Sequence, residues 1–226
     1  MLIDDEIELA EKMEKQDREL GFNDPHGGNL LLTNLLALSF TNISWQTDQK
    51  FRTKVFLLGR KIENLVLIVR RLRNAVSLPL QEGSMETKNK RHIEIDIESF
   101  FYFSFSILDN IARLTPIFYK PESEGTKSRS FRLQRKWFID HPEKDPEYSE
   151  YLRTRTSWFE DLETHRVQLS HYHPLITFLS KEHILTFGTH ENEKGFINNY
   201  PVLKYVNEKS SALLDFIIFY GRHFGK

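Results

Sequence analysis

The sequence contains no cysteine, and this absence excludes several classes of protein at once. Disulfide-bonded scaffolds, thiolate zinc sites, iron–sulfur clusters and cysteine nucleophiles all need a residue that the chain does not have. Glycine and proline are sparse, at 10 and 8 of 226 residues, which excludes collagen-like and low-complexity classes. With 39% hydrophobic and 13% aromatic residues, the composition is that of a globular protein with a buried core.

Neither sign of charge dominates, because 31 basic residues face 32 acidic ones and the formal net charge is −1. A near-neutral chain is not expected to coat nucleic acid non-specifically. Long apolar runs are missing as well: the most apolar early stretch, Leu30–Phe40, is far shorter than the ~20 residues that span a bilayer. We therefore expect no membrane association and, because no signal peptide is visible, a cytoplasmic protein.

Common catalytic signatures are also missing, since the chain has no P-loop, no G-x-G-x-x-G, no H-E-x-x-H and no G-x-S-x-G. The histidines are unevenly placed, and a group of them lies late in the chain: His165, His171, His173, His183 and His190. Imidazole is a good ligand for zinc and other transition metals. No helical H-x-x-x-H pair and no carboxylate at a recognisable ligand spacing accompanies them, so we predict no metal and no cofactor, with a metal-binding bundle as a remaining alternative.

Hydrophobic periodicity predicts long helices in the first half of the chain. Over residues 51–76, apolar residues recur at alternating steps of four and three, which makes one continuous seam. The other faces of this helix are basic and carry Arg70, Arg71 and Arg73, which we interpret first as a solvated face of a bundle helix and, as the functional alternative, as an RNA-binding surface. Residues 93–118 keep helical spacing beyond the usual length of a strand, so we predict a second helix there.

Proline and changes of period mark the later segments. Residues 120–146, rich in proline, serine and charge, are predicted to be a connector. A third long helix is predicted from about Asp145 to His173, and it ends before Pro174 because the residue before a proline avoids the helical region.

A change to β-prone sequence follows. The runs 175–179 and 184–187 predict a small hairpin, and Pro201 lies at or near the first turn of a final helix. The predicted architecture is an all-α antiparallel bundle of four or five helices with this hairpin before the last helix. Residues 1–46 are predicted to be an N-terminal helical extension that packs on the bundle of residues 47–226.

One short stretch of the third predicted helix carries a more specific signal. Arg166 precedes His171 by five positions, which gives the pattern R-x-x-x-x-H at the end of an amphipathic helix. This pattern resembles the motif of HEPN-like proteins. The lead-in with Trp158 and Leu162, the small Ser170 before the histidine, and the hairpin and helix that follow are similar to uncharacterised bacterial members.

The resemblance implies an antiparallel helical bundle, often a homodimer, in which two copies of the motif face each other. Active members are metal-independent ribonucleases, commonly toxins or phage-defence effectors, and an antitoxin or a nucleotidyltransferase is the expected partner. By this resemblance Arg166 would hold the scissile phosphate and His171 would act as general acid or base. Arginine offers a permanently charged fork for phosphate oxygens, and histidine titrates near neutrality.

Two features keep an alternative open, namely a catalytically inactive HEPN-like bundle that acts as a dimeric RNA- or protein-binding module. Five helical steps place His171 about 140° from Arg166, whereas His173 returns to the face of Arg166 and is the reserve candidate. Active members usually carry Asn or Asp directly after the motif arginine, where this chain has Val167, which cannot form a hydrogen bond. A buried or dimer-interface ion pair of Arg166 with Glu163, or with an acid of another helix, would be a purely structural role.

Overall fold

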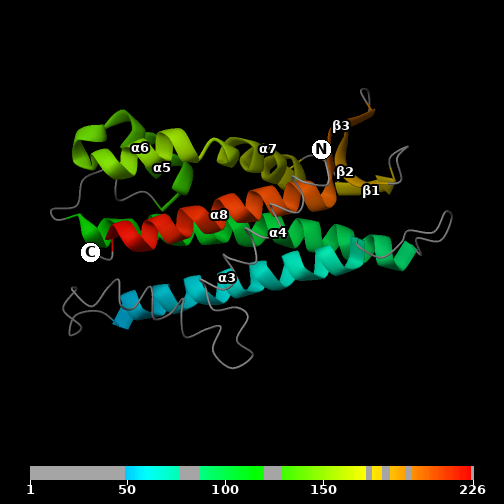
Figure 1. The fold of residues 1–226 in the computed structure, drawn as a ribbon, viewed down its shortest axis with the longest axis horizontal. Helices are drawn as coiled ribbons and strands as arrows, with labels where there is room; N and C mark the ends of the chain where they lie inside the picture. The colour runs from blue at the N-terminus through cyan, green and yellow to red at the C-terminus, as the bar shows by residue number, and fades with distance from the viewer. Residues whose placement is uncertain are drawn as a thin grey trace, which may run out of the picture.

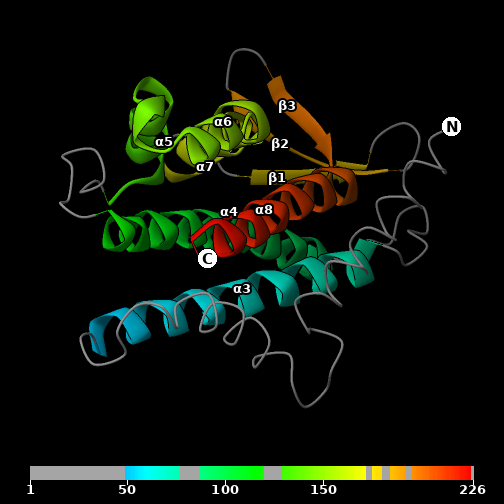
Figure 2. The ribbon, with the colours of Figure 1, turned by 60° about the vertical axis from the view of Figure 1, so that its left-hand side comes forward.

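Two long helices, α4 (Thr87–Leu114) and α8 (Val202–Phe224), lie side by side at the centre of the molecule (Figure 1). The computed structural model describes residues 49–76, 87–119, 129–171, 175–179, 184–191 and 195–224. One side of the central pair is covered by α3, and the other side by the remaining elements (Figure 2). These elements are α3 (Gln49–Val76), α5 (Phe131–Asp140), α6 (Pro146–Arg155), α7 (Trp158–His171), β1 (Leu175–Leu179), β2 (Leu185–Glu191) and β3 (Gly195–Pro201). The predicted extension of residues 1–46 lies outside the described residues.

The first two predicted helices are confirmed. α3 forms where the apolar seam predicts it, and the seam residues Leu58, Ile62 and Leu72 are fully buried. α4 begins at Thr87, earlier than the predicted residue 93, because the polar stretch before the apolar stripe contains no residue that breaks a helix. The predicted end at residue 118 includes a 3₁₀ turn, Thr115–Phe118, in which Pro116 has no N–H to continue the α-helical pattern.

The predicted third long helix is wrong in one respect, since two helices, α6 and α7, replace it. Thr156 lies between them, is fully buried, and donates its hydroxyl to the carbonyl of Leu152. The same hydroxyl accepts a hydrogen bond of 2.6 Å from Nε of Arg135. The backbone carbonyl of Thr156 accepts a hydrogen bond from the backbone amide of Phe159, at the start of α7. The hydrophobic periodicity of the sequence continues across residue 156 without a break. The two hydrogen bonds of the buried Thr156 hydroxyl nevertheless separate α6 from α7.

The predicted connector over residues 120–146 is also wrong in part, because α5 and a 3₁₀ turn over Pro142–Lys144 lie within it. Phe131, Gln134 and Phe138 form the buried stripe of α5. They recur at helical spacing, but the basic residues between them obscured the pattern. Nε2 of the Gln134 side chain donates a 3.0 Å hydrogen bond to the carbonyl of Ala112, so α5 is fastened to the end of α4.

The predicted hairpin is confirmed, and a third strand extends it. β1, β2 and β3 form an antiparallel sheet in that order, with Thr177 paired to Phe187 and Thr189 paired to Ile197. β3 was not predicted because its sequence, Gly195–Pro201, contains one glycine, two asparagines and a proline, residue types that disfavour strands. As an edge strand it tolerates the terminal Pro201, and α8 begins at the next residue.

The fold is thus mostly helical, with a small three-stranded antiparallel sheet before the last helix. None of the helices in the described ranges is both long and apolar enough to cross a lipid bilayer.

Neighbouring leucines of α3 provide a matched test of this packing. Leu58 is 0% exposed and Leu57 is 46% exposed. We expect Leu58→Ala to lower the free energy of unfolding by about 2–5 kcal/mol, because it removes buried contacts and leaves a cavity. Leu57→Ala should change it by no more than about 0.5 kcal/mol. Urea denaturation followed by circular dichroism measures both, and equal effects of the two substitutions would contradict the placement of α3.

Candidate functional site

Arg166 is an exposed residue of α7, and its guanidinium packs against an aromatic ring of α4. Its Cζ atom is 4.7 Å from the ring centroid of Phe105, a buried residue of α4. Cation–π attraction holds a guanidinium over an aromatic face while leaving its N–H groups available in the plane of the group. α7 is anchored by the buried residues Phe159 and Leu162, and the ring of Phe159 lies 5.8 Å from the same Phe105 ring that supports Arg166. The tertiary structure therefore presents Arg166 at the surface in a supported position.

The acidic residues of α7 do not neutralise Arg166, because each is paired with a base from another helix. The pairs are Glu160 with Arg135 at 3.3 Å, Asp161 with Lys209 at 2.5 Å, and Glu163 with Arg132 at 3.5 Å. The expected structural alternative, an ion pair between Arg166 and Glu163, is thus not formed. Within the described part of the chain, no carboxylate pairs with Arg166, and its charge is available to an anion.

His171 is the last residue of α7, and its side chain lies outside the described residues, as does His173. α7 stays helical as far as His171, so five regular steps separate this residue from Arg166. That spacing directs the two Cα–Cβ bonds about 140° apart. Regular helical spacing therefore does not favour a shared face for the two residues, and their joint site stays a prediction.

The three arginines of the candidate RNA-binding surface are engaged with neighbouring helices. Arg71 forms a 2.8 Å ion pair with Asp96 of α4, and Nε of Arg73 donates 2.9 Å to Asn207 of α8. Arg70 and Arg73 line a small depression between α3 and α8. Burial raises the pKa of Asp96, although the nearby charge of Arg71 opposes this rise.

The structure does not bring these arginines next to Arg166. α3 lies on one side of the α4–α8 pair and α7 on the other (Figure 2). Any RNA contact that joins Arg70, Arg71 and Arg73 to Arg166 must therefore pass around the central helices or reach a second copy of the chain.

His165, next to Arg166 in sequence, is turned into the core. Its ring is 5.1–5.7 Å from four other aromatic rings, those of Phe101, Phe187, Tyr200 and Tyr205. Nε2 lies 3.7 Å from Oδ1 of Asp161 and makes no hydrogen bond to any residue of the described ranges. Burial lowers the pKa of His165, Lys209 lowers it further, and Asp161 only partly compensates, so the imidazole is neutral near pH 7.

This placement gives His165 a structural role. His165 helps to seal α7 against β2 and α8 in an aromatic cluster. Over the ranges that the structure describes, no three histidine, aspartate or glutamate side chains are arranged to hold a metal ion.

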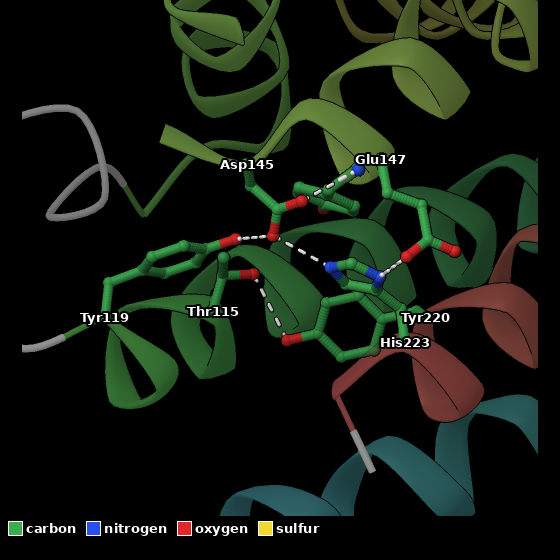
Figure 3. A network of polar contacts seen from close by, with 7 residues as sticks. Thr115, Tyr119, Asp145, Glu147, Tyr220 and His223 are labelled. Carbon is green, nitrogen blue, oxygen red and sulfur yellow. Dashed lines mark hydrogen bonds and ion pairs between the residues drawn. The ribbon is translucent and has the colours of Figure 1, made fainter. Parts of the chain in front are cut away.

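A polar cluster at the other end of α8 was missed by the sequence reasoning (Figure 3). Asp145 caps α6 by accepting a 2.9 Å hydrogen bond from the amide of Tyr148. Its Oδ2 atom also accepts from the hydroxyl of Tyr119 at 2.6 Å and lies 2.8 Å from Nε2 of His223. The Asp-Pro pair at a helix start was the available signal, but nothing in the sequence connects it to a histidine 78 positions later.

No protein-family model matches this chain. Comparisons with curated proteins and with solved structures find no significant match either. The chemistry of the site is therefore argued from the residues of this chain.

The burial of His165 in its aromatic cluster predicts that the free energy of unfolding depends on pH. Because folding lowers the pKa of His165, the unfolded chain binds the proton more readily, and stability is lost as the pH falls below about 6.5. His165→Phe fills the same space without a titratable group. We expect its free energy of unfolding to rise relative to wild type as the pH falls from about 7.5 to 5.5, by at most about 1.4 kcal/mol per pH unit.

Urea denaturation of both proteins at each pH measures this difference. His92→Phe, at an exposed position of α4, is the control and should follow wild type. Parallel curves for His165→Phe and wild type would show that His165 is not held neutral by burial.

Proposed function

We propose that this protein is a HEPN-like, metal-independent endoribonuclease of the toxin or phage-defence type. The observation that carries the proposal is the exposed guanidinium of Arg166, supported by Phe105 at 4.7 Å and unpaired with any carboxylate of the described ranges. A permanently charged fork held in position without a counter-charge suits the oxygens of a phosphodiester.

In the proposed reaction the ribose 2′-oxygen attacks the adjacent phosphorus and the P–O5′ bond breaks. His171 takes the proton from the 2′-hydroxyl or gives one to the leaving 5′-oxygen. Arg166 binds the non-bridging oxygens and stabilises the negative charge that grows on them in the transition state. The products are a 2′,3′-cyclic phosphate and a 5′-hydroxyl, and water makes the proton transfer that His171 does not make.

The regular helix between the two residues supports a homodimer as the active species. Since one α7 directs Arg166 and His171 about 140° apart, the arginine of one copy would meet the histidine of the second. Exposed Val167, beside Arg166, would lie in this contact between copies. An antitoxin or a nucleotidyltransferase that covers α7 would then block the site.

The basic face of α3 would serve binding rather than cleavage. Arg71 remains 63% exposed at its side chain while paired with Asp96, so it can contact a phosphate without leaving its partner. Arg70 and Arg73 lie toward α8 and would extend the same electrostatic surface.

Cleavage of a mixed RNA substrate by the purified full-length chain, with divalent metals chelated, tests the enzymatic proposal. We expect wild type to release 2′,3′-cyclic phosphate ends. Arg166→Ala should lower the rate by roughly 10²–10³-fold and His171→Ala by roughly 10²–10⁴-fold. Arg222→Ala and His92→Ala, both at exposed positions elsewhere, should retain the wild-type rate.

Absence of cleavage by wild type would overturn the enzymatic proposal. Equal rates for wild type and His171→Ala would do the same, because they would point to a contaminating ribonuclease. Circular dichroism of each variant separates a lost site from a lost fold.

A catalytically inactive RNA- or protein-binding module is the second candidate, and Val167 favours it. This residue is 40% exposed directly after Arg166, and its side chain offers no hydrogen bond to a substrate or to water. Such a module keeps the phosphate contact of Arg166 without the groups that complete catalysis.

This candidate predicts binding without product. Fluorescence anisotropy with labelled single-stranded RNA should show an affinity that falls with salt, with a log–log slope of about −0.7 for each phosphate neutralised. Arg166→Ala should weaken binding and reduce that slope, whereas Arg222→Ala should not. Affinity that does not change with salt, or the appearance of cleaved RNA, would rule the inactive RNA-binding module out.

A further inference from the structure

The end of α8 is joined to the start of α6 by a histidine that lies between two carboxylates (Figure 3). Nε2 of His223 is 2.8 Å from Oδ2 of Asp145, and Nδ1 is 3.2 Å from Oε2 of Glu147. An ionised carboxylate can only accept hydrogen bonds, and an imidazole donates from both nitrogens only when it is protonated. A protonated His223 can donate to both carboxylates in this geometry, whereas a neutral ring can donate to only one of them.

Asp145 is arranged to stay ionised beside this cation. It accepts hydrogen bonds from the hydroxyl of Tyr119 at 2.6 Å and from the amide of Tyr148 at 2.9 Å, in addition to the contact with His223. The side chains of Asp145 and His223 are only 14% and 12% exposed. Water therefore gives little screening to their interaction, which makes the charge of His223 more important than in a surface pair.

We propose that Asp145, His223 and Glu147 form a proton-operated clasp between α6 and α8. Protonated His223 holds the start of α6 against the end of α8, and loss of one proton releases that connection. Neutral imidazole can donate to only one of the two carboxylates, so its other nitrogen then presents a lone pair to a negatively charged oxygen. The contact that bound the helices becomes repulsive on one side.

The titratable groups around His223 are tyrosines and carboxylates, so His223 is the group of this cluster that we expect to change its charge near neutral pH. These groups are Tyr119, directly after the 3₁₀ turn that follows α4; Asp145, the N-cap of α6; Glu147 and Tyr148 of α6; and Tyr220 of α8 itself. Arg222 beside it is exposed, and His223 is the only cation paired with Asp145 within the described residues.

The directions of the pKa shifts agree with this assignment. Burial raises the pKa of Tyr119 and Tyr148 far above 10, so both remain neutral donors. Burial alone would lower the pKa of His223, but Asp145 and Glu147 outweigh it and raise that pKa above 6.5. Burial would raise the pKa of Asp145, but its hydrogen bonds lower it below 3.8.

These directions define a window of pH in which the clasp is closed. The contribution of His223 is complete below pH 6.5 and is lost as the pH rises through its higher folded-state pKa. The contribution of Asp145 is complete above pH 3.8 and is lost only as the pH falls through its lower folded-state pKa. The clasp therefore closes in mild acid and opens as the solution becomes alkaline.

Opening the clasp does not detach α6 completely, because aromatic packing also holds it. The ring of Tyr151 stacks on Phe219 of α8 with centroids 3.7 Å apart, and Tyr148 packs against Phe224 at 5.2 Å. Loss of the proton therefore loosens the first turns of α6 while the aromatic contact keeps the helix near α8.

Hydrogen exchange of the full-length chain tests the clasp, with rates corrected for the intrinsic effect of pH. We expect the amides of residues 148–155 to lose roughly tenfold of their protection between about pH 5.5 and 8.5, consistent with a charge-assisted hydrogen bond. His223→Gln, which stays neutral, should show the low level of protection at every pH. His92→Gln, at an exposed position of α4, should retain the wild-type step.

Titration of the His223 ring by NMR gives a readout that does not depend on local opening. The wild-type midpoint should lie above pH 6.5, and Glu147→Gln should move it lower because one of the two carboxylates is lost. A midpoint at or below 6.5, or the same protection step in His223→Gln as in wild type, would overturn the proposal.

Discussion

The burial of α4 on several sides is the constraint on which the other elements depend. This helix contacts α3, α5, α7, α8 and β1, and its aromatic residues Phe100, Phe101 and Phe105 are buried among them. Two of its acids fasten the outer layer: Glu94 accepts hydrogen bonds from the amide and hydroxyl of Thr177 in β1, and Asp109 accepts from the amide of Phe131 at the start of α5. An acid on a core helix is satisfied here by backbone donors, which offsets the cost of its burial.

The contacts that hold α7 against the other helices also determine the surroundings of Arg166. His165 and Leu162 turn inward, and the acids of the helix pair with bases of α5 and α8. Arg166 is consequently left with an aromatic ring of α4 beneath it and without a counter-charge among the described residues. An unpaired cation is worth little to folding, so its supported position is the feature that points toward a ligand.

The two ends of α8 are held by different kinds of interaction. At its start, Tyr205 packs against His165 in the aromatic cluster, where burial keeps the imidazole neutral. At its end, His223 is kept charged by Asp145 and Glu147. The two histidines therefore respond to pH in opposite directions, and acidification strengthens one end of the helix while it strains the other.

Periodicity in the sequence was sufficient to predict α3, α4, α8 and the first hairpin, because each buries a regular stripe on a neighbour. It could not predict the break at Thr156 or the strand Gly195–Pro201, since a buried side-chain anchor and an edge-strand pairing both depend on residues distant in sequence. The motif Arg166–His171 was visible in the sequence, but only the fold decided that Arg166 is exposed and unpaired with Glu163. The clasp of Asp145 and His223 was decided by tertiary structure alone, because spacing along a chain carries no record of which helix ends meet in space.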